Sequence, residues 1–148
     1  MAHSTSVKSS VDSSELRDKW LTRLTDLVKL VDGWAKELDW STRVIQIPME
    51  DSEVGAYKAP ALLLQQEAVR MLLETIERTA LGADGVVDLY LMPAYDDIAS
   101  LYFVDGEWQL RYIFPDQPTV ATIRDAESKP LSKETLSAAL DSMRANGV

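Results

Sequence analysis

Three aspartates are the side chains in this sequence whose type and spacing come closest to a chemical site. Asp96 and Asp97 end a turn-rich segment, Pro93–Asp97, and Asp88 lies on the strand predicted before it. Carboxylates gathered in one loop can bind Mg²⁺ or Ca²⁺, or work as an acid and base pair. The spacing matches no calcium-loop motif, however, and no glycine-rich phosphate loop accompanies it. We therefore interpret the segment as a solvated turn, with no metal site and no catalytic residue.

The chain contains no cysteine and a single histidine, His3. These counts exclude disulfides, thiolate zinc sites and a cysteine nucleophile, and they leave no material for a multi-histidine metal site. His3 lies in residues 1–11, a serine-rich segment that we predict to be a disordered tail. Chemistry would have to use carboxylates, Lys, Arg, Tyr, Ser or Thr, so the composition favours a protein that is not an enzyme and needs no cofactor.

A second candidate site emerges from residues 86–114, which we predict to form a three-stranded antiparallel meander. The Asp105-Gly106 pair between two apolar runs is typical of a two-residue type I′ turn, which pairs Phe103 with Trp108. If Pro93–Asp97 is the preceding loop, Leu91 faces Ala99. Because side chains alternate along a strand, both turns place apolar residues on one common face.

The other face of this meander mixes polar and aromatic side chains. The predicted pairing forms one cross-strand row from Asp88, Tyr102 and Gln109, and a second row from Tyr90, Ser100 and Arg111. Such a face could bind a ligand or a partner protein, although a solvated sheet face carries the same residue types. Our candidate binding residues are Asp88, Tyr90, Ser100, Tyr102, Gln109 and Arg111.

Helices are predicted at both ends of the folded region. The first begins at Asp12, where Glu15 completes a capping box, and its apolar stripe is wide enough to pack on a sheet rather than form a helix dimer. That stripe consists of Trp20, Leu24, Leu27, Val31, Trp34 and Leu38. The C-terminal helix begins at Ser132 and stops at Gly147.

Three segments connect these elements. Residues 42–49 alternate as a strand, and Pro48 places it at a sheet edge or bulge. Residues 59–81 fit either a pair of strands or a buried strand followed by a helix over 66–79, and the helix formers around Glu67 favour the latter. Residues 115–129 could cross a sheet edge through Val120 and Ile123.

The net charge of −9 is concentrated in the middle of the chain. Residues 44–107 hold twelve acidic residues against three basic ones, Lys58, Arg70 and Arg78. A negative field disfavours nucleic acid and anionic membranes. The chain also lacks an apolar run of about 18 residues and a signal-peptide pattern, which predicts a cytoplasmic protein.

These patterns predict one α+β domain over residues 12–148. A long N-terminal amphipathic helix and a C-terminal helix would pack on one face of a mainly antiparallel sheet that contains the meander. We expect a small acidic binding module, chaperone-, adaptor- or immunity-like, whose partner is another protein, with a homodimer as a further option. The alternative is a small-molecule-binding protein or a carboxylate-based enzyme. Its pocket would lie between the N-terminal helix and the meander, with Asp88, Asp96, Tyr102 and Arg111 as its polar groups.

Overall fold

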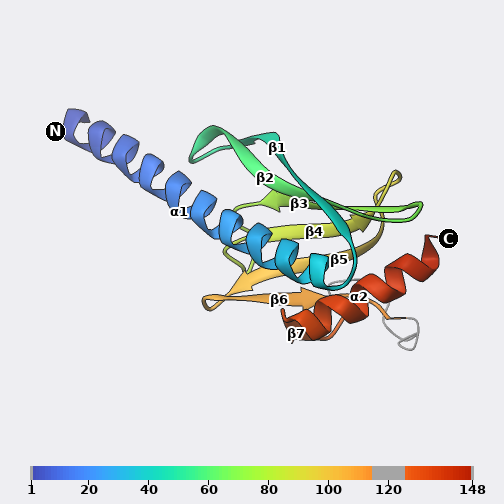
Figure 1. The fold of residues 1–148 in the computed structure, drawn as a ribbon. Coiled ribbons are helices and arrows are strands. Elements are labelled where there is room, and N and C mark those ends of the chain that lie inside the picture. The colour runs from blue at the N-terminus through green and yellow to red at the C-terminus, as the bar shows by residue number, and fades with distance from the viewer. Residues whose placement is uncertain (1, 115–125, 148) are drawn as a thin grey trace.

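The structure is a computed structural model that describes residues 2–114 and 126–147, without the side chains of residues 2–11. It consists of two helices and one seven-stranded antiparallel sheet in which every strand neighbours the next along the chain (Figure 1), which confirms the predicted α+β fold. The elements are α1 (Ala2–Glu37), β1 (Ser41–Asp51), β2 (Gly55–Gln66), β3 (Val69–Glu77), β4 (Val86–Leu91), β5 (Asp96–Val104), β6 (Glu107–Arg111), β7 (Ser128–Pro130) and α2 (Lys133–Asn146).

Both helices lie in front of the sheet in the view of Figure 1, and together they form one layer over its apolar face. The α1 stripe is buried in this interface, since Trp20, Leu24, Leu27 and Val31 are at most 1% exposed. The stripe therefore packs on its own sheet, as predicted, and these four side chains are not available to a second helix.

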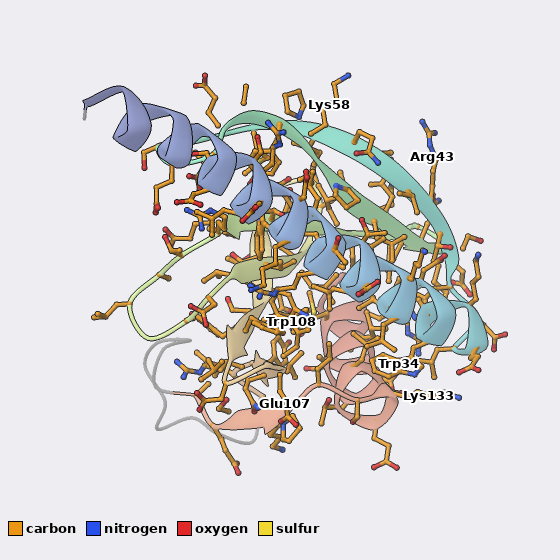
Figure 2. The ribbon with its side chains drawn as sticks, turned by 90° about the vertical axis from the view of Figure 1, so that its left-hand side faces the viewer. Trp34, Arg43, Lys58, Glu107, Trp108 and Lys133 are labelled. Carbon is orange, nitrogen blue, oxygen red and sulfur yellow. The ribbon has the colours of Figure 1, made fainter. Side chains whose placement is uncertain are left out.

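The first turn of α2 confirms its predicted start. The Ser132 hydroxyl accepts a hydrogen bond from the backbone amide of Thr135, whose own side chain returns the contact in a capping box. The apolar side of α2, from Leu136 to Met143, is buried against the sheet. Figure 2 shows Trp34 of α1 and Lys133 of α2 at the same end of the helix layer, where the Lys133 ammonium pairs with Glu37 at 3.1 Å.

Helix α1 begins at Ala2 and so precedes the start that we predicted at Asp12. Residues 2–11 contain neither proline nor glycine, the residues that disfavour a helix most. The separate tail over residues 1–11 and the single domain over 12–148 stay predictions. No helix of the described residues is long and apolar enough to cross a membrane.

The helix favoured over residues 66–79 is wrong, because the segment forms the hairpin of β2 and β3. The two strands pair Leu62 with Leu73 and Gln66 with Val69, and Glu67 adopts a φ of 55° in the turn between them. The helix-forming residues thus lie at the tip of a hairpin, while the alternating apolar residues on either side are buried in the sheet. Burial of those residues outweighs the helical preference of a few residues near the turn.

The meander of β4, β5 and β6 confirms the faces predicted for it but changes one register. Strands β5 and β6 pair Phe103 with Trp108, as predicted, and Asp105 and Gly106 both have positive φ. Strands β4 and β5 instead pair Ala99 with Leu89, not with Leu91. The loop between β4 and β5 is shorter than predicted, because Asp96 already pairs with Leu91. The pairing is irregular between Leu89 and Leu91.

This register change is an offset of two residues, so each side chain keeps its face. The cross-strand rows nevertheless change. Asp88 now faces Ser100, which faces Arg111, whereas Tyr102 lies between Val86 and Gln109. Tyr90 faces Leu72 of β3 rather than Ser100.

The edges of the sheet are β1 and β7, and the β1 edge confirms the position expected for Pro48. The long hairpin of β1 and β2 curves over the body of the protein (Figure 1). Arg43 and Lys58 project outward from this hairpin (Figure 2). Val120 and Ile123, which we expected across a sheet edge, lie outside the described residues.

Candidate functional site

The sheet face opposite the helices carries a hollow of about 640 Å³. Val87, Leu89, Leu101 and Leu110 are buried in the core on the helix side, so the alternate positions of these strands face away from it. Four of the six candidate residues, Asp88, Ser100, Tyr102 and Arg111, line this hollow together. The segment between β3 and β4 forms a wall on one side of the hollow. The remaining lining residues are Ile76, Glu77, Ala80, Leu81, Gly82, Ala83, Val86, Tyr95, Ile98 and Val104.

Asp88 and Ser100 are buried polar residues of this hollow, and Asp88 has an exposed fraction of 6%. The Ser100 hydroxyl donates to Asp88 Oδ1 at 2.8 Å, and the Tyr95 hydroxyl donates to Asp88 Oδ2. Both carboxyl oxygens therefore accept a hydrogen bond, as an ionised carboxylate does. Both donors are uncharged, and among the described residues no Lys or Arg side chain forms an ion pair with Asp88.

Two tyrosines form an aromatic pair beside this carboxylate. The rings of Tyr90 and Tyr95 meet edge to face with centroids 4.4 Å apart, and the Tyr90 hydroxyl donates to Glu74 at 3.0 Å. Burial and then the hydrogen bond to Glu74 raise the pKa of Tyr90 to about 12. Burial and the contact with Asp88 raise the pKa of Tyr95 even further. Both phenols stay protonated at neutral pH, so they donate hydrogen bonds and do not act as bases.

Arg111 lies at the other end of the row that begins with Asp88 and passes through Ser100. Its guanidinium lies over the ring of Tyr102, 4.6 Å from the ring centroid. Two strand spacings separate Asp88 from Arg111, which amounts to about 10 Å between their backbones. The row therefore runs across three strands from the carboxylate of Asp88 to the guanidinium of Arg111.

The remaining candidate residues lie close to the hollow without lining it. Tyr90 is on the same face and holds Tyr95, as described above. Gln109 is half-buried and pairs with Tyr102 and with Pro130 of β7. The sequence interpretation missed Tyr95, because it placed this residue in a solvated loop. It also missed the wall from Ile76 to Ala83, because it favoured a helix through the first half of that segment.

Asp97, next to the β4–β5 turn, makes a structural contact on the opposite face. Asp97 accepts hydrogen bonds from the Tyr112 hydroxyl at 2.8 Å and from Asn146 Nδ2 at 2.7 Å, so it ties β5 to α2. Asp97 therefore does not share a site with Asp88. In the part of the chain that the structure describes, no three His, Asp or Glu side chains are placed to hold a metal ion.

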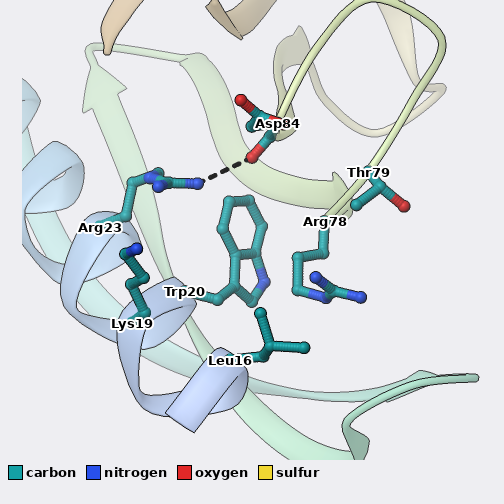
Figure 3. A pocket seen from close by; sticks show the side chains of 7 residues that line it. All are labelled: Leu16, Lys19, Trp20, Arg23, Arg78, Thr79 and Asp84. Carbon is teal, nitrogen blue, oxygen red and sulfur yellow. Dashed lines mark hydrogen bonds between the residues drawn. The ribbon is translucent and has the colours of Figure 1, made fainter. Parts of the chain in front are cut away.

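A second, smaller hollow of about 280 Å³ lies between α1 and the β3–β4 connection (Figure 3). Trp20 stands at its centre, with Lys19 and Arg23 on one side and Arg78 on the other. Arg23 donates to the backbone carbonyl of Asp84 at 2.9 Å and stacks 4.0 Å from the Phe103 ring centroid. This is the place where the alternative interpretation expected its pocket, but Asp88, Asp96, Tyr102 and Arg111 do not line it.

Arg78 in this second hollow is neutralised by the acidic β1–β2 turn. It is 8% exposed and donates to Asp51 at 3.1 Å and to Glu53 at 2.9 Å. Asp51 also accepts the backbone amides of Glu53 and Val54. Burial opposes ionisation of Asp51, but the hydrogen bonds from Arg78 and these amides outweigh it and lower its pKa. The acidity of this turn thus has a structural role.

Comparison of the chain with protein-family models, with curated proteins and with solved structures finds no match. The fold and the site define this chain as an α+β protein whose sheet has one face covered by helices and one face that carries a hollow.

Proposed function

We propose that this protein is a non-catalytic binding module that holds a segment of another protein in the hollow on the open sheet face. The observation that carries the proposal is the hollow itself, in which the polar row of Asp88, Ser100 and Arg111 lies among apolar side chains such as Val86 and Ile98. Apolar walls with a few convergent polar groups are the usual composition of a binding site. A chaperone-, adaptor- or immunity-like role in the cytoplasm would use such a site.

Two features favour binding over catalysis. The tyrosines beside Asp88 are held protonated, and Asp88 already accepts two hydrogen bonds from neighbouring hydroxyls. Acid–base catalysis needs groups that exchange protons near neutral pH, and these tyrosines do not provide them. Asp88 is 6% exposed, which suits the fixing of a bound group better than repeated proton transfer.

A small molecule is the second candidate occupant. The volume of about 640 Å³ falls within the range of small-molecule pockets, roughly 300 to 1,000 Å³. Native mass spectrometry of the protein purified from its source would reveal a tightly held small molecule as a discrete added mass. Such a mass would favour this candidate over a protein segment.

Affinity capture followed by a direct binding measurement tests the main proposal. The wild-type protein and an Ile98→Asp, Tyr102→Ala variant are immobilised, and each captured polypeptide is then titrated against both by calorimetry. Val44→Asp is the matched control, because Val44 is 49% exposed on the edge strand β1, outside the hollow. We expect the hollow variant to lose the partner and the control to retain it. Equal binding by all three proteins would contradict the proposal.

A further inference from the structure

We propose that Asp88 receives the ammonium group of a lysine side chain that the partner segment inserts into the hollow. This inference rests on the proposed function and adds the chemistry of the group that is recognised. Its starting point is the unusual position of Asp88, a buried carboxylate whose two hydrogen-bond donors are both neutral hydroxyls.

A buried carboxylate without a positive partner is costly, and buried charges in proteins are normally paired. Arg78 shows the normal arrangement in this same chain, since two carboxylates surround its buried guanidinium. Asp88 has room for a cation, because an ionised carboxylate offers about four acceptor positions and the two hydroxyls use one on each oxygen. A cation from the partner would therefore complete the site.

The geometry favours an ammonium over a guanidinium. Arginine binds a carboxylate best with two parallel hydrogen bonds that use both oxygens side by side. The Ser100 and Tyr95 hydroxyls already take one position on each oxygen of Asp88, which is 6% exposed, so little room remains for a planar guanidinium to reach both oxygens at once. Lysine presents a compact charge that needs a single free acceptor position, and its aliphatic stem can pack along apolar side chains. Val86 and Ile98 line the hollow and supply that surface.

The charges around the hollow agree with this orientation. Glu77 lines the hollow together with Asp88, and both belong to residues 44–107, which carry the whole negative excess of the chain. Tyr95 also lines this space, and an aromatic ring attracts a cation that approaches its face.

The inference can be tested without knowing the partner. The probes are N-acetyl-lysine-methylamide, the matching norleucine compound, which lacks the ammonium, and n-butylammonium as a free small amine. Binding is followed by the amide NMR shifts of Ile98 and Ser100 in wild type, Asp88→Asn and Asp105→Asn. The last variant is a matched control, because it removes the same charge at an exposed hairpin position where asparagine is equally suited to positive φ.

We expect saturable shifts with the blocked lysine, none with the norleucine compound, and a loss of affinity of about tenfold or more in Asp88→Asn but not in Asp105→Asn. Equal shifts from the lysine and norleucine compounds would overturn the inference, as would an unchanged affinity in Asp88→Asn whose NMR spectrum shows a native fold. Binding of n-butylammonium without binding of the blocked lysine would overturn it as well, because the occupant would then be a small amine.

The captured partner separates this failure from failure of the proposed function. If Asp88→Asn retains the partner at full affinity while the Ile98→Asp, Tyr102→Ala variant loses it, the hollow is the binding site and only the lysine contact is wrong. If both variants retain the partner, the proposed function is wrong too.

Discussion

Among the described residues, Arg78 and Asp51 form an ion pair that is largely buried. Single substitutions can measure how much this pair contributes to the free energy of unfolding. Removing one member of a buried pair leaves the other without compensation, which typically costs about 3 to 5 kcal/mol. Asp51 is only 15% exposed, so we expect Arg78→Met to lower the free energy of unfolding by about 3 kcal/mol in urea titrations.

The matched control is Glu53→Gln, which removes the charge from the second partner of Arg78. Glu53 is 60% exposed, and exposed pairs contribute between about 0 and 1 kcal/mol. A loss in Glu53→Gln as large as the loss in Arg78→Met would show that the turn as a whole, and not the Asp51 pair, provides the stability.

Tyr112 gives a second prediction at the residue scale, at alkaline pH. Burial and then the hydrogen bond to Asp97 raise its pKa from 10.0 to about 12. Because the folded-state pKa is raised, the contribution of Tyr112 to stability is fully present below pH 10.0 and is lost as the pH rises through about 12. We therefore expect the urea midpoint to fall over this window, and to fall less steeply in Tyr112→Phe. Identical slopes in the two proteins would contradict the assignment.

At the scale of the elements, the local turn chemistry explains what the sequence could predict. The β5–β6 pairing was predictable because Asp105 and Gly106 are residues that tolerate positive φ, and both adopt it. The β4–β5 pairing was not, because Tyr95 and Asp97 take positive φ without any glycine to indicate it. The residues of the sheet face opposite the helices were still predicted correctly. The register error was two residues, and an offset of two leaves each side chain on the same face. The second wall of the hollow was missed along with the hairpin of β2 and β3.

That hairpin provides a prediction about its turn. Glu67 holds a φ of 55°, a conformation that costs an ordinary residue about 1 kcal/mol and costs glycine almost nothing. We expect Glu67→Gly to raise the free energy of unfolding by up to about 1 kcal/mol, as measured by urea denaturation. Lys58→Gly, at an exposed and extended position of β2, should instead lower it by about 0.5 to 1 kcal/mol. A loss of stability in Glu67→Gly would show that its side chain has a role in the turn.

Helix α1 docks closely against the residue before β4, and this contact gives another prediction. A Cβ atom on Gly85 would lie 2.6 Å from the Trp20 ring, whose indole nitrogen also donates to the Tyr57 hydroxyl at 3.0 Å. Gly85→Ala must displace this ring, so we expect a loss of about 1 to 3 kcal/mol and a shifted Trp20 indole NMR signal.

Gly33→Ala is the matched control for this substitution. Gly33 lies within α1, and apart from its chain neighbours and the adjacent backbone of its own helix, nothing lies within 4 Å of the Cβ it would gain. Alanine is the better helix former by about 1 kcal/mol, so the same chemical change should stabilise the protein here. If Gly85→Ala were as well tolerated as Gly33→Ala, the close packing of Trp20 on the β4 entry would be refuted.

At the scale of the whole molecule, the two sheet faces differ in what they carry. One face carries both helices and the apolar core, and the other carries the hollow, so substitutions in the hollow leave the contacts between the helices and the sheet in place. The net charge of −9 resides in residues 44–107, which form β2, β3, β4 and β5 and most of β1. An excess of this kind accelerates the approach of a basic partner over long range.

This charge distribution predicts how binding of the captured partner depends on salt. The Debye length falls from about 10 Å at 0.1 M salt to about 3 Å at 1 M, so the association rate should fall steeply over that range. In Glu77→Gln, Glu107→Gln the rate at low salt should be lower and its salt dependence weaker, because two charges on the strands that border the hollow are removed. Glu134→Gln, Asp141→Asn removes the same charge from α2, on the helix-covered face, and should leave both quantities nearly unchanged. Stopped-flow kinetics measures these rates, and an equal effect of the two double substitutions would mean that net charge, and not its position beside the hollow, guides the partner.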